Sequence, residues 1–145
     1  MNKRHFKKII NGYKSAPINQ LYKPKMDLSL GKSIIQIKIL QQFHHSANSL
    51  HGSIYFKMLD DAAWAASNTY VEDVFLFTYN FNIFLTKPVS KGLITSKGML
   101  VEKKDKKYIA KSYLFDDNDN EIANGSGIFM RSNYLLKDAI GFKEK

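Results

Sequence analysis

The sequence predicts an α+β protein in which an antiparallel sheet wraps around one central, buried helix. Residues 53–68 are apolar on nearly every helical face, and a helix of that kind has to be enclosed by other structure. After it, apolar and polar residues alternate in successive runs separated by polar turns, a pattern typical of hairpin-linked strands. Antiparallel strands with one segregated helix define the α+β class. At 145 residues, the chain has the size of one domain.

The chain opens on a short basic segment with helical periodicity. Lysines occupy most of its faces, and the apolar residues recur at helical spacing on the remaining one: Phe6, Ile9, Ile10 and Tyr13. Gly12, Pro17 and Pro24 limit this helix to a few turns. A basic arm for nucleic acid or an anionic membrane is one interpretation. We favour the other, a short helix that packs its apolar stripe on the domain and leaves its lysines solvated.

The main domain is predicted to begin with a strand at Lys32, where isoleucines start to alternate with polar residues. Residues 43–52 contain turn and capping residues in place of a periodic pattern, so we expect a loop that leads into the central helix. Ser53 is the expected N-cap of that helix. The row of alanines within it allows a sheet to approach its axis closely.

Four more strands are expected after the helix, over residues 74–85, 93–101, 108–115 and 122–130. The pattern divides the chain into three parts. These are an N-terminal helix and linker at 1–31, a main domain at 32–132 and a C-terminal tail at 133–145. We expect the tail to be frayed from Lys137 onward.

The composition limits the possible chemistry. The chain has no cysteine, which excludes disulfides, thiolate nucleophiles and Cys-ligated metal centres. His44 and His45 have neither a suitably spaced carboxylate partner nor an HExxH pattern, so we expect no metal and no cofactor. Although the formal net charge is +9, nucleic-acid binding would rest on that charge alone and is not expected. No signal peptide and no run of 18 apolar residues occurs, so we expect a cytoplasmic protein without membrane insertion.

The junction of the loop and the central helix is the strongest candidate for a reactive site. A helix N-terminus exposes free backbone N–H groups and a partial positive charge, so it can polarise a carbonyl or stabilise an oxyanion. Gly52 has no side chain to block that approach. Asp60, about two turns further on, is a carboxylate on an otherwise apolar helix, which suits an acid, base or nucleophile. The alternative is a structural carboxylate satisfied by a hydroxyl or a lysine.

Asp61 follows Asp60 directly and raises the question of a paired-carboxylate site. Adjacent helix positions point about 100° apart, so the two carboxylates cannot converge on one substrate atom from one chain. We therefore expect Asp61 to be a rim or interface group.

The same residues resemble a family signature. His51-Gly52-Ser53, followed by Asp60 nine positions after the histidine, is similar to the signature of hotdog-fold acyl-CoA thioesterases of the phenylacetyl-CoA thioesterase-like (PaaI-type) group. The resemblance covers about residues 32–131 and continues in segments 78–83, 87–88, 92 and 122–125.

This resemblance implies a hotdog fold and hydrolysis of an acyl-CoA thioester to the free acid and CoA. It implies that the Gly52 amide polarises the thioester carbonyl and that Asp60, reaching across from the partner subunit, is general base or nucleophile. Thr78 stands where family members carry a hydroxyl that positions water. His45 stands where they commonly have an asparagine that helps to hold the site, so we include it among the catalytic residues.

Five further residues are expected around the substrate: His51, Asn48, Ser53, Asp61 and Asn80. His51 is expected to shape the turn, Asn48 stands where the family often has glycine, and Ser53 replaces the second glycine of the signature. The resemblance also implies a homodimer or homotetramer, with acyl-CoA as the substrate. The alternative function is a non-catalytic binding or sensor module for acyl-CoA or an acyl carrier on the same fold.

Overall fold

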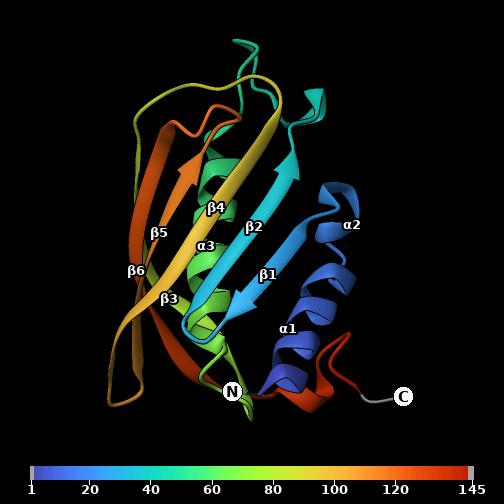
Figure 1. Cartoon of the computed structure of the whole chain (residues 1–145), viewed down its shortest axis with the longest axis vertical. Coiled ribbons are helices and arrows are strands. Elements are labelled where there is room, and N and C mark those ends of the chain that lie inside the picture. The colour runs from blue at the N-terminus through green and yellow to red at the C-terminus, as the bar shows by residue number, and fades with distance from the viewer. Residues whose placement is uncertain (1, 144–145) are drawn as a thin grey trace.

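A curved antiparallel sheet wraps around one long helix in the computed structural model of the chain, which describes residues 2–143 (Figure 1). The strand order is β1-β2-β4-β5-β6-β3, and all neighbouring strands are antiparallel. The helix, α3 (Gly52–Asn68), packs on one face of this sheet. The strands are β1 (Lys25–Ser29), β2 (Lys32–Lys38), β3 (Val74–Leu85), β4 (Leu93–Lys104), β5 (Lys107–Phe115) and β6 (Glu121–Leu135). The predicted α+β arrangement is confirmed.

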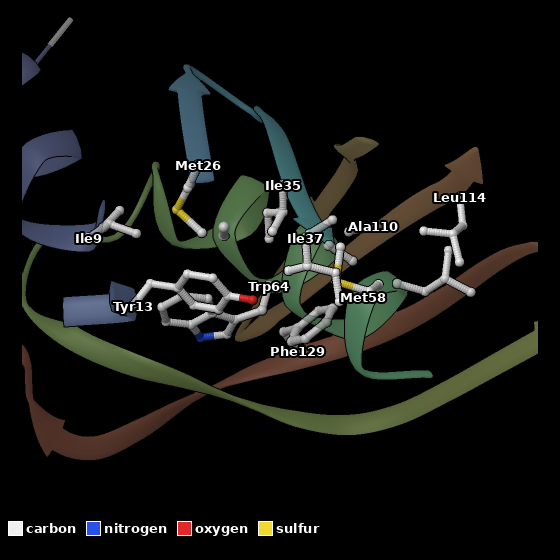
Figure 2. Close-up of a cluster of buried hydrophobic side chains, with 14 of the residues drawn as sticks. Ile9, Tyr13, Met26, Ile35, Ile37, Met58, Trp64, Ala110, Leu114 and Phe129 are labelled. Carbon is white, nitrogen blue, oxygen red and sulfur yellow. The ribbon is translucent and has the colours of Figure 1, made fainter. Parts of the chain in front are cut away.

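Small and apolar side chains bury α3 against the sheet. Leu59 and Ala62 are fully buried, and Met58 is 1% exposed. Figure 2 shows Met58 among side chains from the strands, including Ile35 and Phe129. The second half of the helix, residues 62–68, is buried on every face, whereas Ser53 and Phe56 in its first half are exposed.

Gly98 of β4 lies where the sheet comes close to α3. A Cβ atom at this position would lie 2.2 Å from the backbone oxygen of Ala62. Gly98→Ala should therefore lower the free energy of unfolding by about 1–3 kcal/mol, because helix and sheet have to move apart. Urea unfolding measures the effect, and Gly52→Ala is the control, since its added Cβ would meet only Leu85 at 3.4 Å. Equal unfolding midpoints for the two variants would contradict this close packing.

Strand β1 is an element that the sequence analysis did not predict. It lies within residues 1–31, which were assigned to a helix and linker, and it pairs with β2 so that Met26 is opposite Ile35. Its five residues offer too few alternations of apolar and polar residues for a clear signal. The division of the chain at residues 31 and 132 stays a prediction.

The N-terminal segment folds as α1 (Lys3–Ser15) and α2 (Asn19–Tyr22), with α1 beside β1 (Figure 1). Phe6, Ile9 and Tyr13 of α1 are buried. The prediction that this helix packs its apolar stripe on the domain is confirmed. None of the helices within residues 2–143 is long and apolar enough to cross a membrane.

The expectation of a tail frayed from Lys137 is wrong for residues 137–143. A short 3-10 helix, Leu136–Asp138, follows β6, and Phe142 is only 4% exposed. The ring of Phe142 occupies the space that a side chain at Gly12 would need, because a Cβ there would lie 2.1 Å from it. The Asn11 side-chain amide also donates to the Gly141 carbonyl at 2.6 Å. The C-terminal segment is thus packed against α1.

Candidate active site

The first turn of α3 is capped by the side chain of His51. The Ser53 amide donates to His51 Nδ1 at 3.0 Å, and the Ile54 amide donates to the His51 carbonyl at 3.0 Å. The prediction that Ser53 is the N-cap is therefore wrong, because an imidazole nitrogen accepts the bond that a serine hydroxyl was expected to accept. The amide of Gly52 donates to no partner within residues 2–143. It is available to a ligand at the positive end of the helix.

The loop before α3 brings two histidine rings together. Asn48 has φ of 61°, a left-handed conformation that asparagine adopts more readily than most residues. The Ala47 amide donates to His45 Nδ1 at 3.1 Å, so a neutral His45 ring carries its proton on Nε2. The His45 and His51 rings meet edge to face, with centroids 6.4 Å apart. Both rings thus lie near the N-terminus of α3.

Asp60 lies further along α3, where Thr78 of β3 holds its carboxylate. The Thr78 hydroxyl donates to Asp60 Oδ1 at 2.8 Å. Burial raises the pKa of Asp60 to about 6, with a smaller upward effect from Asp61. The bond from Thr78 and the charge of Lys57 lower this pKa without overcoming the effect of burial. A carboxylate with a pKa near neutrality can accept and return a proton at physiological pH.

Asp61 has other partners than Asp60. It accepts hydrogen bonds from the Tyr13 hydroxyl at 2.6 Å and from Lys57 Nζ at 2.5 Å. Lys57 also donates to the Asn19 side-chain oxygen at 2.7 Å. Burial, and after it the charge of Asp61, raises the pKa of Tyr13 well above its usual value, so Tyr13 stays a donor. The two adjacent aspartates do not converge, as predicted.

Gly52 and Asp60 of one chain cannot act on the same carbonyl group. They are eight residues apart on one helix, a separation of about 12 Å along its axis. The Gly52 end of α3 lies near Leu85 at the end of β3, whereas Asp60 is bonded to Thr78 in the first half of that strand. One chain therefore contains two separate halves of the expected site.

A cavity of about 610 Å³ lies beside Asp60 and Thr78. Its walls are mainly apolar and come from α1, α2, α3, β3, the end of β6 and the C-terminal segment. Asp61 also lines it, but the cavity does not include Asn80, which is exposed in β3 and accepts a bond from the Asn82 amide at 2.8 Å. Across residues 2–143, no cluster of His, Asp or Glu side chains is placed to hold a metal ion.

The contacts that α1 and α2 make with the site were not predicted from the sequence. Tyr13 was expected to pack on the domain, and nothing local to it indicates a bond to Asp61. Lys57 did offer a signal, since it stands four residues before Asp61 on the helix, a spacing that favours an ion pair. Asn19, in the segment assigned as a linker, offered none.

Comparison with known proteins identifies the family. The family model for the thioesterase superfamily matches residues 47–123, slightly more than half of the chain, and this part includes the His51-Gly52 turn, Asp60 and Thr78. The chain belongs to the thioesterase superfamily. No curated protein sequence matches it significantly.

Solved structures share the fold of this chain. The PaaI protein of the phenylacetic acid degradation operon of E. coli superposes with a TM-score of 0.82 at 13% identity, covering 91% of this chain and 96% of PaaI. A variant of the phenylacetic acid degradation protein PaaI from Thermus thermophilus has a TM-score of 0.73 at 16% identity, covering 81% of this chain and all of that protein. The predicted hotdog fold and the resemblance to thioesterases are confirmed, and the two PaaI proteins share this fold.

Proposed function

We propose that this protein hydrolyses the thioester of an acyl-CoA to the free acid and CoA, with Asp60 as the residue that drives the attack on the carbonyl carbon. The observation that carries the proposal is the Asp60–Thr78 pair, with 2.8 Å between the two oxygens, at the edge of an apolar cavity. Because burial raises the pKa of Asp60 to about 6, its carboxylate is a stronger base than an exposed aspartate and is still largely ionised at neutral pH.

The site is completed by a second subunit. Strand β3 is twelve residues long and forms one edge of the sheet. Its side chains Phe77, Tyr79 and Phe84 are 53–70% exposed. A long apolar edge strand of this kind favours pairing with another strand. In an antiparallel pair of two β3 strands whose twofold axis passes between the two copies of residue 81, residue 84 of one chain, next to Leu85, is opposite residue 78 of the other. The Gly52 end of each subunit then lies beside Asp60 of its partner.

The reaction follows from these positions. Water bound beside the Thr78–Asp60 pair gives a proton to the Asp60 carboxylate as its oxygen bonds to the carbonyl carbon. The amide of the partner subunit's Gly52, with Nε2–H of His45 from that subunit, stabilises the negative oxygen. The C–S bond then breaks, and the departing thiolate takes up the proton. Attack by the Asp60 carboxylate itself would give a mixed anhydride that water cleaves, and a single turnover in ¹⁸O-labelled water distinguishes the two routes.

Substrate contacts from the residues around these groups belong to the same proposal: His51, Asn48, Ser53, Asp61 and Asn80. In the proposed homodimer, the first three lie at or near the helix N-terminus and Asn80 lies on the paired strand.

Thiol release from a panel of short, long and aromatic acyl-CoAs tests the proposal. The chain has no cysteine, so a thiol-reactive dye reports released CoA without a background from the protein. Turnover of at least one substrate is expected. If no thiol is released while acyl-CoA raises the melting temperature, the protein is instead a binding module on this fold.

The pH dependence of kcat/KM tests the role of Asp60 through its neighbour. Activity should fall as the pH drops below about 6, because the carboxylate becomes protonated. The charge of Asp61 raises the pKa of Asp60 and that of Lys57 lowers it. Asp61→Asn removes the first charge and leaves the second, so the acidic limb should move to lower pH. If the acidic limb of the kcat/KM profile keeps its midpoint or moves to higher pH in this variant, Asp60 is not the titrating group.

A further inference from the structure

We infer that the cavity beside Asp60 holds the acyl group of the substrate, and that Ile18 and Ile140 at its wall limit the size of that group. The inference rests on the proposed function and adds its substrate class: thioesters of bulky, apolar acyl groups. Ile18 lies in the turn between α1 and α2 and Ile140 in the segment after β6, so segments that flank the central part of the fold would set the specificity.

The position of the cavity decides which part of the substrate enters it. Asp60 and Thr78 line it, so a thioester carbonyl attacked there lies at its edge. One side of that carbonyl carries the acyl group, and the other carries CoA with its charged phosphates. An apolar cavity favours the acyl side, because burying phosphates without partners is costly.

The lining of the cavity suits an apolar group. Seven aromatic side chains contribute to it: Tyr13, Phe56, Trp64, Phe75, Phe77, Tyr134 and Phe142. Trp64, which Figure 2 shows in the buried cluster with Tyr13, donates its indole N–H to the Leu76 carbonyl at 2.9 Å. The centroids of the Trp64 and Phe75 rings are 4.9 Å apart. The polar atom of Trp64 is satisfied, so its ring is left to contact a ligand.

Apart from Asp60, the charges in the wall are already paired. Lys57 and Asp61 bond to each other, and Tyr13 and Asn19 complete the network. An anionic acyl group would have to displace Asp61 from Lys57 to find a cation there. The paired charges therefore favour an uncharged acyl group.

The size of the cavity fits a group much larger than acetyl. Its volume of about 610 Å³ lies within the usual range for small-molecule sites, roughly 300–1,000 Å³. Ile18 and Ile140 line it although they are 64% and 61% exposed, as expected for side chains at an opening. Both lie outside residues 47–123, the part that the family shares, so this wall is a feature of the flanking segments.

Enlarging the two isoleucines tests the inference. Ile18→Tyr and Ile140→Tyr should lower kcat/KM for decanoyl-CoA and phenylacetyl-CoA by about tenfold or more, and that for acetyl-CoA by less than about twofold. Leu21→Tyr is the control, since Leu21 is 52% exposed on α2 but does not line the cavity. An equal loss with all three substrates, or no loss with any, would overturn the inference.

A binding measurement separates this inference from the proposed function. Trp64 is the only tryptophan of the chain and lines the cavity, so its fluorescence should change saturably when decanoate is added. Ile18→Tyr and Ile140→Tyr keep this single probe and should weaken the response. If thiol release is absent but the response is present, only the hydrolase proposal fails. If thiol is released but Trp64 does not respond, the cavity is not the acyl site.

Discussion

Asp60→Asn should lower kcat by about 10²–10⁴-fold, the usual contribution of a general base. The substitution keeps the shape of the side chain and an oxygen that can accept the Thr78 hydrogen bond, which is 2.8 Å long in the native protein. It removes only the ability to take a proton or attack as a carboxylate. Thiol release at saturating substrate measures the effect, and activity within about tenfold of the wild type would exclude Asp60 from the chemical step.

The stability of the same variant provides its control. The folded protein raises the pKa of Asp60 from 3.8 to about 6, so the ionised carboxylate costs stability at neutral pH. This cost develops as the pH rises through the range from 3.8 to about 6 and is constant above it. Asp60→Asn should therefore be more stable than the wild type at pH 7 by about 2–3 kcal/mol and lose that advantage near pH 4. A variant that is inactive and less stable at pH 7 would indicate misfolding.

Gly52→Pro should lower kcat by about 10²–10³-fold, the effect of losing one hydrogen-bond donor to an oxyanion. Gly52 is the first residue of α3, where proline is well tolerated because its missing N–H is not used within the helix. The substitution thus removes the donor and keeps the helix. Gly52→Ala retains the N–H and adds a Cβ with an ordinary 3.4 Å contact, so it should keep most of the activity. Equal activity of the proline and alanine variants would exclude the amide.

Mixing two inactive variants tests whether the site is shared between subunits. In a mixed dimer of Asp60→Asn and Gly52→Pro, one of the two sites combines an intact Gly52 with the partner's intact Asp60. Co-expression should therefore restore activity to about a quarter of the wild-type value if the subunits pair at random. If both residues acted within one chain, no mixed dimer would contain an intact site and no activity would return.

The elements that were predicted correctly are those whose pattern is local. The central helix is apolar on nearly every face over more than four turns, and the strands after it alternate over eight or more residues, so each carries its own signal. Strand β1 has only five residues and is recognisable mainly by its partner β2. The N-cap was assigned to Ser53 because serine caps helices well, and only the geometry of the turn identifies His51 as the cap.

The residues of the candidate site also separate into those with a local sequence signal and those without one. Gly52, Asp60 and Thr78 follow from a short signature and from one strand at a fixed distance in the chain. The bond between Tyr13 and Asp61 joins residues 48 positions apart, and the packing of Phe142 on Gly12 joins the two ends of the chain. Contacts of this kind depend on tertiary packing and leave no periodic trace, so the cavity wall could not be predicted.

The contact between the first and last segments affects the protein during synthesis. The apolar stripe of α1 is made before the sheet, yet part of its cover, Phe142, is made only after β6. A chain still on the ribosome therefore exposes this stripe while the sheet is being completed, and contacts between such distant residues form slowly. The cavity beside Asp60 cannot close until residues 139–142 have been made. The nascent chain would thus be unable to select its substrate before synthesis has passed that point.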